Sequence, residues 1–241
     1  MNAIRRIAMW SGPRNLSSAM MRSFGSRSDC QVWDEPFYAA YLARTGIDHP
    51  MRQETLATCE QDAEKVVDGL LGPLRDGLSV HYQKHMTHHM VPGMPRDWMA
   101  HVQNVFLIRH PARVLASYSA KREEPVLSDL GFVEQAELFD HVRAMGQSPI
   151  VVDAADIREN PERMLKKLCE ALDLRFDAGM LSWPSGAHPD DGVWALHWYA
   201  SLWASTGFAG PETGPPPESD RTDILEPAMA IYERMHAQRL S

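Results

Sequence analysis

An apolar run that gives way abruptly to a polar turn is the feature that most constrains the fold of this chain. Residues 7–10 (IAMW) are apolar, residues 11–18 (SGPRNLSS) are mostly polar or turn-forming, and apolar residues at four-residue spacing follow. This order predicts a buried strand, a sharp turn and a helix. The free backbone N–H groups and the positive dipole at the beginning of such a helix bind phosphate and other anions.

The side chains of this turn also favour an anion site. Arg14 adds a fixed cation, and Ser17 and Ser18 add hydroxyl groups in the first helical turn. The turn differs from the nucleotide triphosphatase loop G-x-x-x-x-G-K-[ST], because no Lys precedes the serines. An alternative reading is purely structural, with the serines as helix caps. The residues predicted to hold the anion are Gly12, Pro13, Arg14, Asn15, Leu16, Ser17 and Ser18.

Length, composition and net charge limit the number of domains and the kinds of ligand that this chain can have. The 241 residues are 44% hydrophobic, and we predict a single domain over 1–241 with an exposed Pro/Gly-rich loop at 207–220. The net charge of -8 argues against broad binding to nucleic acid or to a membrane surface. The three cysteines are widely spaced, and neither a charged leader nor a long apolar run is evident. We therefore expect a soluble cytoplasmic protein with reduced thiols.

Apolar runs and helical periodicities alternate along the chain. Strands are predicted at 4–10, 30–33, 78–83, 102–108 and 150–152, and helices at 16–24, 37–42, 54–71, 111–118, 161–172 and 227–239. This alternation favours an α/β fold of three layers, in which a central parallel sheet is flanked by helices. Ligands of such sheets bind at the carboxyl ends of the strands. The charged residues predicted to lie at these ends are Arg14, Glu35, Lys84 and Arg109.

A second candidate anion site follows the strand predicted at 102–108. Arg109 comes directly after this strand, and Ser117 lies eight residues further on, two turns into the next helix. An arginine and a serine placed in this way can both point at one phosphate. The alternative is an ordinary corner between a strand and a helix, with a surface arginine.

Together the two segments resemble the sulfotransferase family, whose members use 3′-phosphoadenosine 5′-phosphosulfate (PAPS). In that family a Pro-[Lys/Arg]-Ser-Gly-Thr-Thr type loop after the first strand holds the 5′-phosphosulfate, and residues 13–18 (PRNLSS) look like it. A later Arg-x-Pro, with a Ser eight residues after the Arg, holds the 3′-phosphate, and Arg109, Pro111 and Ser117 match that spacing. The resemblance covers residues 4–176 and implies a P-loop-type fold.

Further segments agree with this resemblance, and others depart from it. Residues 151–169 are similar to the family's late strand-helix unit, and residues 82–86 resemble the strand before its substrate-side loop. The tail looks like that of a bacterial and plant subgroup, some of whose names suggest aminotransferases, although no motif supports pyridoxal phosphate chemistry. Asn15 and Leu16 replace the usual Ser-Gly, so we expect a more restricted turn, and no late Arg-Lys-Gly-type loop is evident.

The resemblance implies an enzyme that transfers the sulfuryl group of PAPS to a hydroxyl or amine of a small-molecule acceptor, without a metal. Arg14 and the backbone N–H groups of residues 15–18 would stabilise the leaving phosphate, and the hydroxyls of Ser17 and Ser18 would bond the 5′-phosphate. Arg109 and Ser117 would bind the 3′-phosphate.

The acceptor needs a base, and three residues are candidates. Glu35 is the first, since the resemblance implies a glutamate after the second strand. The alternative is that residues 34–36 cap the next helix. His85 is the second candidate, because histidine serves as the base in other branches of the family, and His49 is the third.

Other features leave alternatives open. Four histidines cluster at 81–89, but no Glu stands between them as in zinc-binding helix motifs, so no metal site is predicted. Trp183, Trp194, Trp198 and Trp203 are predicted to pack in a core or, alternatively, to line an acceptor pocket.

An ATP-dependent phosphotransferase and a non-catalytic nucleotide-binding protein are the competing functions. The sequence fixes no oligomeric state, and a homodimer is compatible with it.

Overall fold

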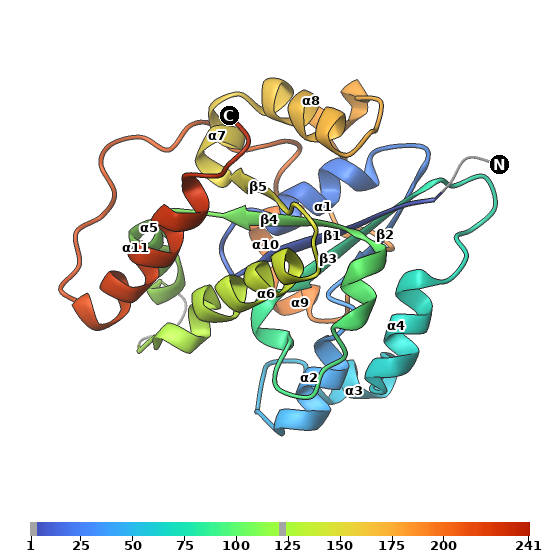
Figure 1. Cartoon of the computed structure of the whole chain (residues 1–241), viewed down its shortest axis with the longest axis horizontal. Coiled ribbons are helices and arrows are strands. Elements are labelled where there is room, and N and C mark those ends of the chain that lie inside the picture. Colours follow the sequence, from blue (N-terminus) through green and yellow to red (C-terminus); the bar gives the residue numbers. More distant parts are fainter. Residues whose placement is uncertain (1–3, 121–123) are drawn as a thin grey trace.

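Five parallel strands form the sheet at the centre of the structure (Figure 1). The computed structural model describes residues 4–120 and 124–241. Within them the strands are β1 (Arg5–Ser11), β2 (Cys30–Asp34), β3 (Val80–Met86), β4 (Gln103–Ile108) and β5 (Ile150–Asp153). They lie in the order β2-β3-β1-β4-β5, and each neighbouring pair is parallel. The carboxyl ends of all these strands therefore lie along one edge of the sheet.

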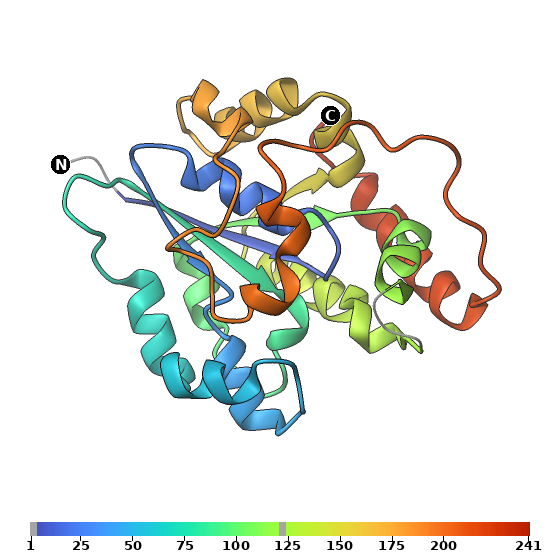
Figure 2. The ribbon, with the colours of Figure 1, turned by 180° about the vertical axis from the view of Figure 1, so that it is seen from behind.

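Helices cover both faces of this sheet (Figures 1 and 2). α1 (Ser17–Gly25) and α8 (Pro161–Ala171) lie on one side, and α4 (Ala63–Leu71) and α6 (Phe132–Ala144) lie on the other. The remaining helices of the described residues are α2 (Tyr38–Thr45), α3 (Arg52–Thr58), α5 (Pro111–Ser119), α7 (Ala154–Glu159), α9 (Ala195–Trp198), α10 (Ala200–Trp203) and α11 (Thr222–His236), with 3₁₀ turns η1 (Thr87–His89), η2 (Asp97–His101), η3 (Leu127–Leu130) and η4 (Ala178–Leu181). The predicted three-layer α/β fold with a central parallel sheet is confirmed. None of these helices is long and apolar enough to span a membrane.

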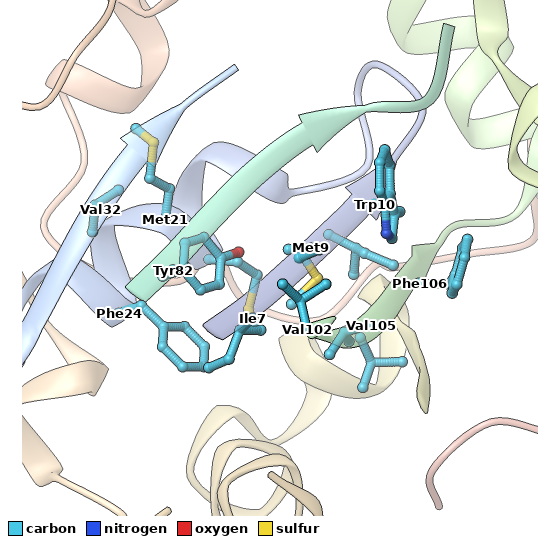
Figure 3. Packing of buried hydrophobic residues seen from close by; sticks show 14 of the residues in the cluster. Ile7, Met9, Trp10, Met21, Phe24, Val32, Tyr82, Val102, Val105 and Phe106 are labelled. Carbon is cyan, nitrogen blue, oxygen red and sulfur yellow. The ribbon is translucent and has the colours of Figure 1, made fainter. Parts of the chain in front are cut away.

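The central strands are buried because helices pack on both of their faces. Ile7, Met9 and Trp10 of β1 are fully buried (Figure 3). Phe24 of α1 stacks on Tyr82 of β3 with ring centroids 4.4 Å apart. Burying a large apolar side chain contributes about 1.5–3 kcal/mol. This packing therefore holds α1, and the turn that precedes it, against the sheet.

The element boundaries show where local sequence signals were incomplete. The helix predicted at 54–71 is instead two helices, α3 and α4, because Asp62 caps α4 by accepting a hydrogen bond from the Glu64 N–H at 3.0 Å. β3 continues past its predicted end at 83 to Met86. α11 begins at Thr222 rather than at 227. Helix α6 has no counterpart in the prediction.

The segment 207–220 joins α10 to α11 as a long coil along the outside of the molecule (Figure 2). It contains no helix, and Gly207 at its start makes an isolated bridge with Ser182. Most of its residues are exposed, but the side chain of Glu212 is only 6% exposed. The mostly exposed segment therefore contains one buried carboxylate, that of Glu212.

Candidate active site

Residues 11–18, which we call the anion loop, connect the end of β1 to the beginning of α1. Two of them have left-handed backbone conformations, with φ of 62° at Arg14 and 74° at Leu16. This conformation costs an ordinary L-residue about 1–2 kcal/mol. Leu16 adopts the left-handed conformation that glycine usually supplies, so the leucine does not prevent this backbone geometry.

The beginning of α1 leaves backbone donors without intrahelical partners. Leu16 is the N-cap residue, its side chain makes no capping bond, and no acidic residue lies in the first turn. The N–H groups of residues 17–19 precede the first intrahelical bond, which runs from Met20 N to Leu16 O at 3.1 Å. The alternative in which a serine caps this helix therefore does not describe the structure. Ser17 is buried and Ser18 half-buried in the first turn.

The glycine of the anion loop is required by close packing. A Cβ atom on Gly12 would lie 2.2 Å from the carbonyl oxygen of Leu130, at the corner that leads into α6. Pro13 is half-buried beside it, and Asn15 is buried, with its Nδ2 donating to Leu107 O at 3.5 Å. The anion loop is thus pressed between β4 and the beginning of α6.

The two predicted anion sites adjoin one another. Arg14 Nε donates to Ser117 Oγ in α5 at 2.9 Å. Arg109 Nη1, from the corner between β4 and α5, donates to the carbonyl oxygen of Arg14 at 2.7 Å. Partial burial, and then the positive charge of Arg109, lower the pKa of Arg14. The structure therefore brings Arg14, Arg109 and Ser117 together at one edge of the sheet.

A cluster of arginines, Arg109, Arg113 and Arg158, surrounds the carboxylate of Glu212. Arg109 Nε and Arg158 Nη1 donate to Glu212 Oε1 at 2.9 and 2.8 Å, and Arg113 Nε lies 3.0 Å from Oε2. Of these cations, only Arg109 was predicted from the sequence. The one signal for Arg158 was its position after β5, where a parallel sheet exposes polar groups.

A second ionic cluster, which we call the Lys84 cluster, lies at the ends of β2 and β3. Lys84 Nζ donates to Asp34 Oδ1 and to Tyr199 OH, each at 2.9 Å, and forms an ion pair with Glu35. Asp34 stands opposite Lys84 in the register of the two strands. Burial alone would lower the pKa of Lys84, but the neighbouring carboxylates outweigh burial and raise that pKa. Lys84 lies inside β3 rather than after it.

Glu35 lies just beyond β2 with a left-handed backbone, at φ 44°. Burial, joined by the negative charge of Asp34, raises the pKa of Glu35 although Lys84 opposes the shift. Glu35 Oε2 is 3.9 Å from His89 Nε2. The N-cap residue of α2 is Phe37, and its side chain makes no capping hydrogen bond. The carboxylate of Glu35 therefore does not cap this helix.

His85 and His49, the other two candidate bases, contact aromatic side chains. His85 is buried and stacks on Trp10, with ring centroids 4.5 Å apart, and burial lowers the pKa of its imidazole well below the usual value. His49 Nδ1 shares a hydrogen bond with Tyr38 OH at 3.0 Å. Glu35, the first candidate base, forms an ion pair with Lys84.

The tryptophans divide between the core and the surface. Trp183 and Trp194 are buried, and Trp194 meets the edge of Tyr38 with ring centroids 5.0 Å apart. Trp198 is 40% exposed, so it does not pack in the core as predicted. In residues 4–120 and 124–241 no group of three or more His, Cys, Asp or Glu side chains could hold a metal ion.

Two curated relatives from Arabidopsis thaliana, the branched-chain-amino-acid aminotransferase-like proteins 1 and 2, are 38% and 37% identical to this chain over 239 residues. The alignments cover 98% of this chain, which spans only 42% of the length of each relative.

Solved sulfotransferase structures share the fold. One, from Alicyclobacillus acidocaldarius, has a TM-score of 0.59 and 13% identity, covering 99% of this chain and 98% of that chain. The sulfotransferase domain from the curacin biosynthetic pathway has a TM-score of 0.53 and 14% identity, covering 95% of this chain and 99% of that chain. The family model of the sulfotransferase domain matches residues 5–239, nearly the whole chain, and the chain therefore belongs to this family.

Proposed function

We propose that this protein moves the sulfuryl group of PAPS to a hydroxyl or amine of a small acceptor. The observation that carries the proposal is the junction of two cationic regions, tied by the 2.7 Å hydrogen bond from Arg109 Nη1 to Arg14 O. One region is the anion loop, and the other is the corner between β4 and α5. A nucleotide with phosphate groups at both its 3′ and 5′ positions carries the anions that two such adjoining regions bind.

The anion loop fits the end of the nucleotide that carries the sulfuryl group. As the sulfur–oxygen bond of the donor breaks, negative charge grows on the phosphate oxygen that leaves. The N–H groups of residues 17–19 and the guanidinium of Arg14 would stabilise that charge. The hydroxyls of Ser17 and Ser18 would donate to the 5′-phosphate. Arg109 and Ser117 would bind the 3′-phosphate.

The Lys84 cluster fits the acceptor side of the reaction. The raised pKa of Glu35 makes its carboxylate a stronger base than an exposed glutamate, which favours removal of the acceptor proton as the new bond to sulfur forms. Lys84 fixes that carboxylate through their ion pair.

Ligand-dependent thermal stability tests the donor. A ligand that binds only the folded protein raises its Tm, so we expect stabilisation by adenosine 3′,5′-bisphosphate and by PAPS. Stabilisation by ATP with Mg²⁺, and by neither of the other two, would replace this proposal with an ATP-dependent phosphotransferase.

Transfer of label from radiolabelled PAPS tests the reaction. A panel of phenols, alcohols and amines provides the acceptors, and at least one should become labelled in a protein-dependent manner. Tight binding of the bisphosphate together with no transfer to any acceptor would identify a non-catalytic nucleotide-binding protein.

A further inference from the structure

Glu212 lies in an exposed segment but is itself almost fully enclosed. Its side chain is 6% exposed, whereas the residues on either side of it are exposed. Both carboxylate oxygens are engaged, since Oε1 accepts from Arg109 and Arg158, and Oε2 lies 3.0 Å from Arg113 Nε. The carboxylate of Glu212 thus makes charge-assisted contacts with all three arginines of the cluster.

The arginine cluster carries more charge than Glu212 can balance. Three guanidinium groups face one carboxylate, so the cluster keeps an excess of positive charge. The same cluster joins the anion loop, because Arg109 also donates to the carbonyl oxygen of Arg14. A phosphate group, with a charge near -2 at neutral pH, would balance the arginines better than a single carboxylate does.

The segment that carries Glu212 also contacts these same arginines through its backbone. Arg158 Nε donates to Gly210 O at 2.8 Å, and Arg113 Nη2 donates to Gly214 O at 2.6 Å. The two glycines flank Glu212, and a Cβ atom added at either would meet nothing within 4 Å. The segment contains no helix and has open space beside Gly210 and Gly214, so its displacement breaks the contacts with the arginine cluster but no helical hydrogen bonds.

We propose that Glu212 is an internal anion that occupies the subsite for the 3′-phosphate and leaves it when the donor nucleotide binds. This inference rests on the proposed function. Glu212 then sets the affinity and the selectivity of the donor site, because the nucleotide must replace the contacts that the carboxylate makes with Arg109, Arg113 and Arg158. A nucleotide without a 3′-phosphate does not compete with Glu212.

Calorimetric titration of Glu212→Gln, Glu212→Ala and the unmodified protein tests this inference. The ligands are adenosine 3′,5′-bisphosphate and adenosine 5′-monophosphate, and circular dichroism confirms that the variants are folded. Both variants should bind the bisphosphate about tenfold or more tightly than the unmodified protein does. Their affinity for the monophosphate should change by less than about twofold. Glu218→Gln, in the same exposed segment, is the matched control and should bind both ligands as the unmodified protein does.

The outcomes separate this inference from the function on which it rests. Equal or weaker binding of the bisphosphate by folded Glu212 variants, with clear binding by the unmodified protein, overturns the role of Glu212 and leaves the donor assignment standing. An equal gain for both nucleotides also overturns it, because the effect would then be one of general charge. Absence of bisphosphate binding by every form overturns both proposals.

Discussion

Backbone strain at single residues gathers at the proposed site. Among the described residues, the non-glycine positions with positive φ are Arg14, Leu16, Glu35, Met51 and Asp173. The first two belong to the anion loop, and Glu35 is the proposed base. Such conformations persist only where the surroundings enforce them, and they concentrate at functional sites. Arg14 and Glu35, a cation and a carboxylate, thus have strained backbones in the segments that follow β1 and β2.

Replacing Glu35 with glutamine should slow transfer and preserve nucleotide binding. The amide keeps the size of the side chain but cannot take a proton, and loss of a general base lowers the rate about 10²–10⁴-fold. The measurement is kcat with radiolabelled PAPS, beside a calorimetric titration with the bisphosphate. His85→Gln is the comparison, since His85 is the second candidate base. Near-normal turnover by Glu35→Gln, with a large loss in His85→Gln, would transfer the role to the histidine.

Replacing Arg14 with alanine should weaken binding of the bisphosphate. Loss of a charge-assisted contact to a phosphate costs about 1.5–3 kcal/mol, which is roughly tenfold to a hundredfold in Kd. Calorimetry measures the change, and Arg163→Ala serves as the control because Arg163 is exposed on α8. An unchanged affinity in Arg14→Ala would remove the anion loop from the donor site.

At the scale of elements, the site depends on how the anion loop meets the beginning of α6. Gly12 touches the backbone at Leu130, and Gly131 adopts φ +68° at the start of that helix. Thr87 Oγ1, just after β3, donates to Gly131 O at 2.9 Å. The ends of β1 and β3 and the start of α6 are therefore fixed to one another by close backbone packing and by the hydroxyl of Thr87, not by large side chains.

Replacing Gly12 with alanine should disturb this junction. The new Cβ would lie 2.2 Å from a backbone oxygen, so either the anion loop or the start of α6 must move. Overpacking of this kind costs about 1–3 kcal/mol, and the shift should also weaken bisphosphate binding. Thermal unfolding measures the loss of stability. Gly210→Ala, where an added Cβ meets nothing within 4 Å, is the control and should unfold at the same temperature as the unmodified protein.

The elements themselves followed from local patterns, whereas the contacts between distant residues did not. A helix was predicted at 161–172, and Asn160 Oδ1 accepts from Arg163 N at 3.0 Å at the start of α8. The sequence pattern does not predict the hydrogen bond from Tyr199 OH to Asp34 Oδ2 at 2.8 Å. It also does not predict that Glu212 is buried among arginines. Such contacts join residues far apart in the sequence, and only the packed chain brings them together.

At the scale of the whole molecule, β3 places polar and titratable side chains in the interior. All of its residues are buried, including His81, Lys84 and His85. The Lys84 cluster compensates the charge of Lys84 with carboxylates. Burial lowers the pKa of His81 in β3 to about 4, and that of His88, in the η1 turn that follows β3, to about 4. The folded protein therefore holds these imidazoles in their neutral form at neutral pH.

Lowering the pH below the ordinary pKa of histidine should therefore destabilise the protein. In the unfolded chain a histidine takes up a proton near its ordinary pKa, about 6.5, whereas folded His81 and His88 do so near 4. Between these values the unfolded state binds more protons, so the free energy of unfolding falls with decreasing pH, by up to about 1.4 kcal/mol per pH unit for each histidine. Urea unfolding at a series of pH values measures the slope, and His81→Gln should reduce it, while the same change at exposed His101 should leave it unaltered. A slope equal in His81→Gln and in the unmodified protein would show that burial of His81 does not oppose its protonation.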